Sequence, residues 1–130
     1  MDSKTILLID DEIDIRKLTK IVLEGAGYKV TTAFRGKRGI KKAKKGKIDL
    51  IILDVMMPDM DGYEVIKNLN QDKATKNIPV VFFSAKTQKK EIEKGLSLGA
   101  RGYLTKPFDP EEFPQKIRKF ISKTERGRNS

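Results

Sequence analysis

The sequence predicts an α/β fold in which helices flank a parallel sheet. Short apolar runs that do not alternate with polar residues are typical of strands buried on both faces, as in a parallel sheet. Segments with helical spacing of apolar residues separate these runs, so strands and helices alternate along the 130 residues. A chain of this length is expected to form one domain with its own core.

Five segments are candidate strands. Four of them are short apolar runs, of which the last is the weakest: 6–9, 50–53, 80–83 and 102–104. The other candidate is the β-prone segment 28–32. Because the runs are apolar throughout, we expect most of the sheet to be covered on both faces.

Five helical patterns lie between and after these strands. The positions expected to face the core are Leu18, Ile21, Val22 and Gly25; Gly36, Gly39, Ile40 and Ala43; Val65, Ile66 and Leu69; Ile92, Leu96 and Gly99; and Phe113, Ile117, Phe120 and Ile121. In the second helix, lysines and arginines cover the opposite face. Gly27 is a stop signal for the first helix, and the last helix is predicted to have Asp109 as N-cap and Pro110 at N1.

The residue types exclude several kinds of chemistry. The chain has no cysteine, which excludes disulfides and thiol chemistry, and no histidine, which excludes histidine catalysis and a phosphohistidine on this chain. The first residues have no long apolar stretch, so we expect no signal peptide. Every apolar run is far shorter than the ~20 residues of a membrane span. We therefore expect a cytoplasmic protein without membrane insertion.

Polar side chains follow four of the predicted strands. They are Asp10 and Asp11, Asp54, Ser84, and Lys106. The carboxyl ends of parallel strands lie along one edge of a sheet, where ligands bind, so we expect these side chains to converge. For a single residue, a turn or cap role would explain the position equally well. The five together are hard to explain as structural residues.

This set of side chains is suited to binding a phosphoryl group. Clustered carboxylates repel one another unless a cation is present, and Mg²⁺ binds both carboxylates and phosphate oxygens. Lys106 would add a positive charge and Ser84 a hydrogen bond. With no histidine or cysteine available, the remaining nucleophile is a carboxylate, and aspartyl phosphates are known intermediates.

The sequence resembles the receiver domain of two-component response regulators, such as the chemotaxis regulators. The matching stretches are ILLIDDE (6–12), LIILDVMMPDMDGYE (50–64), VVFFSAK (80–86) and GARGYLTKPFDPEE (99–112), and the resemblance covers about residues 4–122. It implies a three-layer αβα, flavodoxin-like fold with a five-stranded parallel sheet in the order 2-1-3-4-5 and five helices.

The resemblance implies a Mg²⁺ site and a phosphoacceptor. Asp54 matches the phosphoacceptor, which takes a phosphoryl group from a histidine kinase or a histidine phosphotransfer protein. Asp11 matches the direct Mg²⁺ ligand, and Asp10 the acidic neighbour that acts through water. Asp54 itself and the backbone carbonyl of Met56 complete the metal ligands. Glu12 is more simply explained as a first-turn acid of the first helix than as a neighbour of the metal.

The resemblance also implies a switch. Lys106 matches the lysine that pairs with the phosphoryl oxygens, and Ser84 the hydroxyl that hydrogen-bonds them. Tyr103 matches the aromatic switch residue that turns inward when Ser84 moves. The Lys106-Pro107 bond is usually cis in the family. Phosphorylation would change the surface of helix four, strand five and helix five, to which a target protein or output domain would bind. The resemblance is also compatible with a homodimer that forms on phosphorylation. We expect no enzyme activity beyond self-phosphorylation and slow autodephosphorylation.

Two features depart from the family pattern. Pro114 lies about one turn into the predicted last helix, where proline can kink a helix and alter the output face, unless the first turn absorbs it. The net charge is +10. Residues 35–47 carry eight basic and no acidic residues, and residues 116–128 carry six basic and one acidic. Residues 1–123 are assigned to the receiver domain, and 124–130 to a basic tail that we expect to be mobile or the start of a linker.

Two other functions are considered. A DNA-associated regulator would use the basic helices, but the basic segments lack stacking aromatics apart from Phe120, which the helical pattern places in the core. We therefore do not expect direct nucleic-acid binding; a binding assay across salt concentrations separates the two functions. A phosphohydrolase with an aspartyl nucleophile would use a second carboxylate two positions after Asp54, where the sequence has Met56.

Overall fold

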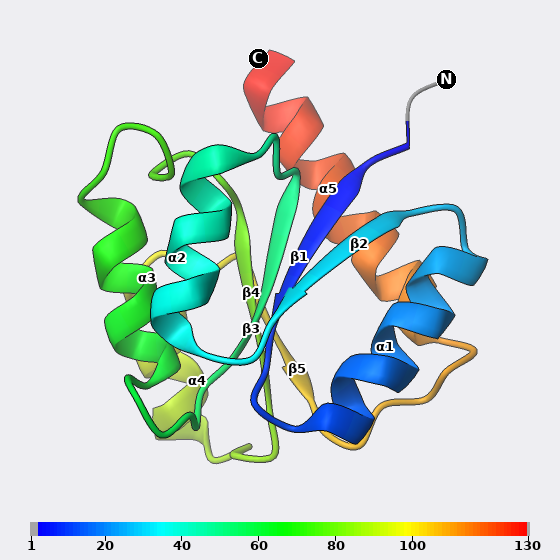
Figure 1. Cartoon of the computed structure of the whole chain (residues 1–130), viewed down its shortest axis with the longest axis horizontal. Coiled ribbons are helices and arrows are strands. Elements are labelled where there is room, and N and C mark those ends of the chain that lie inside the picture. Colours follow the sequence, from blue (N-terminus) through cyan, green and yellow to red (C-terminus); the bar gives the residue numbers. More distant parts are fainter. Residues whose placement is uncertain (1–2, 130) are drawn as a thin grey trace.

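The computed structural model describes residues 3–129, with side chains through residue 122. Strands and helices alternate along the chain (Figure 1). The strands are β1 (Thr5–Ile9), β2 (Lys29–Ala33), β3 (Leu50–Asp54), β4 (Val80–Ser84) and β5 (Gly102–Thr105). The helices are α1 (Ile13–Gly25), α2 (Gly36–Lys45), α3 (Gly62–Asn70), α4 (Lys89–Ser97) and α5 (Phe113–Asn129).

The strands form a parallel sheet in the order β2-β1-β3-β4-β5, as predicted. The register pairs Ile9 with Ala33 and Leu53, and Asp54 with Phe83. Strands β1, β3 and β4 are buried almost throughout, which explains their continuous apolar sequences. Because all five strands run in one direction, their carboxyl ends share one edge of the sheet.

Helices cover both faces of the sheet and make three layers (Figure 1). One core packs α2 and α3 against the face formed by Leu7, Ile9, Ile51, Leu53 and Phe82. The other core packs α1 and α5 against the opposite face, formed by Ile6, Leu8, Leu50, Ile52, Val81 and Phe83. Helix α4 lies on the first face, beside β5. Among the described residues, no helix combines the length and the apolar character needed to cross a bilayer.

The predicted faces of three helices are confirmed. In α2, Gly36, Gly39 and Ala43 are buried and Ile40 is half-buried, while the basic side chains are exposed except that of Lys42, which is half-buried. In α3, the predicted residues Val65, Ile66 and Leu69 are buried. In α5, Phe113, Ile117 and Ile121 are buried and Phe120 is half-buried.

The predicted core face of α1 is wrong. Leu18 and Ile21 are exposed, by 45% and 67%, and Thr19 and Leu23 are the buried residues. Val22 is half-buried and Gly25 is exposed. This helix has apolar side chains on two faces, so spacing alone cannot decide which face turns inward. The result is an exposed apolar patch, the α1 patch, formed by Ile13, Leu18 and Ile21.

The predicted core face of α4 is also only partly correct. Ile92 is half-buried, whereas Leu96 and Gly99 are exposed and Gly95 is buried. A Cβ at Gly95 would lie 2.8 Å from Cδ2 of Phe82, so glycine allows the helix to approach the sheet at this point. A glycine carries no apolar signal, and the sequence pattern therefore could not identify it as the contact.

Helix α5 begins at Phe113, three residues later than predicted. Asp109 does accept a hydrogen bond from the Glu111 amide, but residues 110–112 form a turn before the helix. Pro114 is consequently the second helical residue, where an amide has no partner within the helix, so the first turn absorbs the proline, which was one of the two alternatives considered. The helix continues through Asn129, and the side chains of residues 123–130 lie outside the described residues.

Candidate functional site

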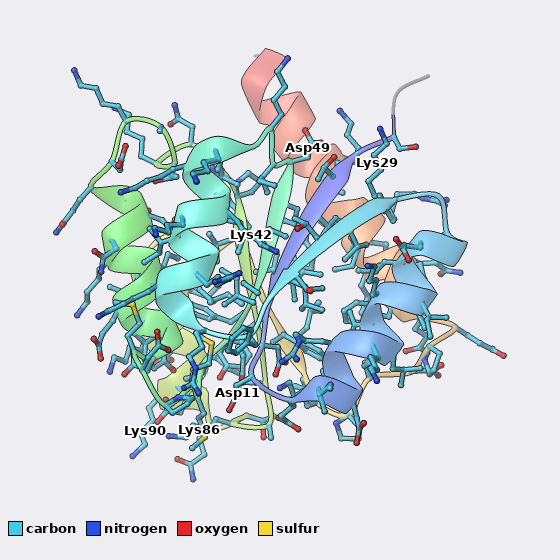
Figure 2. All side chains as sticks on the ribbon, viewed as in Figure 1. Asp11, Lys29, Lys42, Asp49, Lys86 and Lys90 are labelled. Atoms are coloured by element: carbon cyan, nitrogen blue, oxygen red, sulfur yellow. The ribbon has the colours of Figure 1, made fainter. Side chains whose placement is uncertain are left out.

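The polar residues at the strand ends converge at one edge of the sheet, as predicted. Asp10 follows β1, Asp54 ends β3, and Lys106 follows β5. The ammonium nitrogen of Lys106 lies 2.7 Å from Oδ2 of Asp10 and 3.5 Å from Oδ1 of Asp54. Figure 2 shows Asp11 at this same end of the molecule, near Lys86 and Lys90.

Four carboxylates gather at this edge. One carboxylate oxygen from each of Asp10, Asp11, Glu12 and Asp54 lies within 4.8 Å of the others. Asp10 and Asp54 are buried, while Asp11 and Glu12 are exposed. The group therefore has a buried side next to Lys106 and an open side toward solvent.

Lys106 is the central cation of the site. Its side chain is 8% exposed, and its nitrogen contacts Asp10, Asp54 and Oε1 of Glu12, the last at 3.0 Å. The expectation for Glu12 was incomplete: it is the N-cap residue of α1, yet its carboxylate reaches the site. Its position directly after two strand-end aspartates was the signal that could have revealed this.

Burial and crowding control the protonation of the site. Burial, followed by the charge of Asp10, raises the pKa of Asp54 to about 7. Burial also raises the pKa of Asp10, although Lys106 opposes this. Burial acts to lower the pKa of Lys106, but its contacts with Asp10, and then with Asp54, outweigh that effect and raise it. Lys106 thus stays protonated, while the buried carboxylates lack enough positive charge to ionise easily.

The loop after β3 holds Asp54 in place. The amide of Gly62 donates a 2.7 Å hydrogen bond to the carbonyl of Val55. A Cβ at Gly62 would lie only 2.4 Å from the carbonyl oxygen of Asp54, so the loop requires glycine at this position. The amide of Met56 lies 3.4 Å from Oδ1 of Asp54, and the metal-ligand role of the Met56 carbonyl stays a prediction.

The other two aspartates of this loop cap helices. Asp61 accepts from the Glu64 amide at the start of α3. Asp59 accepts from the amides of Gly36 and Lys37 at the start of α2. Neither belongs to the carboxylate group.

Ser84 and Tyr103 lie on the neighbouring strands. The Ser84 hydroxyl is buried and accepts a 3.0 Å hydrogen bond from the Lys86 amide. The Tyr103 ring centroid lies 6.0 Å from that of Phe82, and its hydroxyl is buried with no hydrogen-bond partner among the described residues. The Lys106-Pro107 peptide bond is cis, as the resemblance implied.

An open groove of about 730 Å³ leads to the exposed side of the acidic cluster. It runs from Asp11 past Met56 and Lys86 to Tyr63. No pattern in the sequence indicated a role for Tyr63. Its hydroxyl donates a 2.8 Å hydrogen bond to Oε2 of Glu91 and so connects α3 to α4. The carboxylates of Asp11 and Glu12 are therefore open to solvent through this groove.

The family model that describes the response regulator receiver domain matches residues 6–118. The chain belongs to this family. A receiver domain is the phosphorylation-dependent signalling module of two-component systems, which agrees with the acidic cluster and the buried lysine described above.

Several curated proteins are similar to this receiver domain. It is 42% identical over 123 residues to the alkaline phosphatase synthesis transcriptional regulatory protein PhoP of Bacillus subtilis, covering 95% of this chain and 50% of that protein. It is 42% identical over 121 residues to the DNA-binding dual master transcriptional regulator RpaA of Synechocystis, covering 93% of this chain and 50% of that protein. The chain thus spans about half the length of these relatives.

Solved structures show the same fold. Chemotaxis protein CheY4 of Vibrio cholerae has a TM-score of 0.87 at 34% identity, covering 92% of this chain and 99% of that one. A CheY-like receiver domain protein from Methanospirillum hungatei has a TM-score of 0.89 at 27% identity, covering 97% of this chain and 99% of that one.

The structure does not favour direct DNA binding through both basic segments, because α2 and α5 pack against opposite faces of the sheet.

Proposed function

We propose that Asp54 of this receiver domain accepts a phosphoryl group and that Mg²⁺ assists the transfer. The observation that supports this most directly is the buried Asp54 carboxylate, held 3.5 Å from the buried Lys106 ammonium within a group of four carboxylates. An isolated carboxylate at a strand end would have a structural explanation, but a buried acidic cluster around one lysine has a net negative charge that needs a cation.

The residues present suit a magnesium ion. Oδ2 of Asp10 is buried and contacts Lys106 as an ion pair without hydrogen-bond geometry, and burial, followed by the charge of Asp10, raises the pKa of Asp54 to about 7. Asp11, Asp54 and the Met56 carbonyl would hold the ion, with Asp10 acting through water. Bound Mg²⁺ would supply positive charge for the carboxylates and for the phosphoryl oxygens.

The chain's own residues would carry the transfer. An ionised Asp54 oxygen attacks the phosphorus in line and forms a carboxyl–phosphate bond, while the bond from phosphorus to the donor breaks and its electron pair leaves with the donor. Lys106, fixed by Asp10, neutralises negative charge on the phosphoryl oxygens. No second residue is needed as a nucleophile, so we propose no enzyme activity beyond self-phosphorylation and slow autodephosphorylation.

The phosphorylated state would differ through contacts that only it can make. The phosphoryl oxygens would accept hydrogen bonds from the Ser84 hydroxyl and from Lys106, and would draw the loops after β4 and β5 toward Asp54. The Tyr103 hydroxyl is buried and has no hydrogen-bond partner among the described residues, so no hydrogen bond would have to break for its side chain to change conformation. The surface of α4, β5 and α5 would thereby change for a target protein, an output domain or a second copy of the chain.

The donor would be a histidine kinase or a histidine phosphotransfer protein. The first residue of the α1 patch is Ile13, which directly follows Glu12 and is 54% exposed. Exposed apolar side chains on the helix that begins directly after Glu12 are suited to docking a donor helix. We expect Leu18→Asp to slow phosphotransfer from a kinase that phosphorylates the wild type, with no change in the rate with acetyl phosphate.

We also propose residues 1–123 as the receiver domain and 124–130 as its tail or the start of a linker.

Intact-mass measurement after incubation with acetyl phosphate tests the proposal. We expect wild type to gain one phosphoryl group only when Mg²⁺ is present, and Asp54→Asn to gain none. Asp14→Asn, which changes an exposed aspartate outside the carboxylate group, should behave as wild type. Phosphorylation of folded Asp54→Asn to the wild-type extent would disprove the assignment.

A further inference from the structure

A second feature lies on the α2 side of the molecule, apart from the acidic cluster. The segment 35–47 carries eight basic residues and no acidic ones. Among the described residues, Lys44 alone of these eight has a carboxylate partner, Asp72 at 3.3 Å. Lys42 donates a hydrogen bond to the backbone carbonyl of Thr32, and the other basic side chains of the segment are exposed. The face of α2 is thus a concentration of unneutralised positive charge.

This charge lowers the stability of the helix that carries it. Lys37, Lys41 and Lys45 follow one another at four-residue spacing, and so do Arg38 and Lys42. Like charges at this spacing repel one another on a helix surface. The helix has no acidic residue of its own to relieve the repulsion. A negatively charged partner would relieve it.

The basic face borders an apolar groove between α2 and α3. The groove has a volume of about 680 Å³, and its apolar lining comes from Phe34, Ile40 and Met60. Lys37, Arg38 and Lys41 form its cationic rim, and Asn68 of α3 lies on the opposite wall. Phe34 is 46% exposed although it is a large aromatic residue. We refer to this site as the Phe34 groove.

The walls of the Phe34 groove are already fixed in place. Asp59 binds the amides of Gly36 and Lys37, each at 3.1 Å, which anchors the start of α2 to the loop that carries Met60. The guanidinium carbons of Arg16 and Arg35 lie 5.8 and 5.6 Å from the Phe34 ring centroid. A preformed site loses little conformational freedom on binding, which favours affinity.

We propose that the Phe34 groove binds an acidic polypeptide segment of a partner protein, with an apolar side chain of that segment against Phe34, Ile40 and Met60. Carboxylates on either side of the apolar residue would pair with Lys37, Arg38 and Lys41. A nucleic acid suits the groove less well. The cations follow a single helix of ten residues, roughly 15 Å long, and Phe34 is the one aromatic residue among the described lining residues on which a base could stack.

Binding of synthetic peptides to the full chain tests the proposal. The probes are three twelve-residue peptides of Asp and Glu, each with one Leu-Phe pair at a different position, and a control peptide in which Ser replaces Leu and Phe. Amide chemical shifts would locate the site, and fluorescence anisotropy would give the affinity. We expect at least one Leu-Phe peptide to shift residues 34–41, 59–60 and 68, and to bind at least tenfold more tightly than the Ser peptide.

Three variants separate specific from general charge effects. Arg38→Glu/Lys41→Glu and, separately, Phe34→Ala should each weaken peptide binding at least tenfold. Lys73→Glu/Lys76→Glu makes the same change in net charge at exposed positions outside the groove and should leave binding within twofold of wild type. All variants should still be phosphorylated by acetyl phosphate at the wild-type rate, because none of these residues belongs to the acidic cluster.

Four outcomes would overturn the proposal. They are no shift at the groove with any peptide at millimolar concentration; equal binding of the Ser peptide; equal loss in Lys73→Glu/Lys76→Glu; and tighter binding, through the same residues, of a twelve-nucleotide single-stranded DNA. The last outcome would assign the groove to nucleic acid. Failure of Asp54 phosphorylation would leave these tests unaffected, since the two sites share no residue.

Discussion

Lys106 and Asp10 form a buried ion pair across the carboxyl edge of the sheet, with 2.7 Å between the ammonium nitrogen and Oδ2. Asp10 is fully buried and the Lys106 side chain is 8% exposed. The pair aims the lysine at Asp54, 3.5 Å away, before any phosphoryl group is present. The positive charge that the proposed transfer requires is therefore in position in the resting protein.

Lys106→Met tests how strongly this cation supports the fold. Removing it leaves Asp10 and Asp54 buried without the Lys106 cation, and we expect the free energy of unfolding at pH 8 to fall by about 3 kcal/mol. The loss should be smaller at pH 5, because the pKa of Asp54 is about 7 and this carboxyl is then protonated. Urea denaturation in metal-free buffer measures it. Lys90→Met, at an exposed position of α4, should stay within about 0.5 kcal/mol of wild type.

Asp54→Asn tests the raised pKa of the acceptor. Burial, followed by Asp10, raises the pKa of Asp54 from 3.8 to about 7, so the folded state holds its proton more tightly than the unfolded state. Its contribution to stability is present below pH 3.8 and is lost as the pH rises through 7. In metal-free buffer we expect Asp54→Asn to gain on the order of 4 kcal/mol over wild type between pH 4 and pH 8. Parallel stability curves of the two proteins would contradict the shift.

Asp11→Asn tests the magnesium site. A cation that binds only the folded state stabilises it, by about 1.4 kcal/mol at ten times the dissociation constant. We expect Mg²⁺ to raise the melting temperature of wild type and of Asp14→Asn, and to have little effect on Asp11→Asn. Line broadening of amide signals around Asp10, Asp11 and Asp54 by Mn²⁺ would locate the ion. Equal stabilisation of all three proteins would place the ion elsewhere.

Gly62→Ala tests the close approach beneath the acceptor. A Cβ at this position would lie 2.4 Å from the carbonyl oxygen of Asp54, and backbone atoms cannot move away as a flexible side chain can. We expect the free energy of unfolding to fall by about 1–3 kcal/mol and phosphorylation by acetyl phosphate to slow. Gly25→Ala is the matched control, because no atom lies within 4 Å of a Cβ there. It should show neither effect.

The amino-acid sequence determined the elements and most of the site. Continuous apolar runs identify strands covered on both faces, and the polar residues that end them, Asp10, Asp54, Ser84 and Lys106, lie at one edge because parallel strands end together. These are local signals combined with one topological rule. They required no knowledge of how side chains pack.

Only the tertiary structure decided which faces turn inward and which distant residues meet. Helix α1 carries two apolar faces, and packing on the sheet buries Leu23 while it leaves Leu18 and Ile21 exposed. Glu12 reaches Lys106, Tyr63 reaches Glu91, and Phe34 and Met60 line a groove beside α2. Contacts of this kind depend on the distances between elements in three dimensions, and neither hydrophobic periodicity nor residue spacing contains those distances.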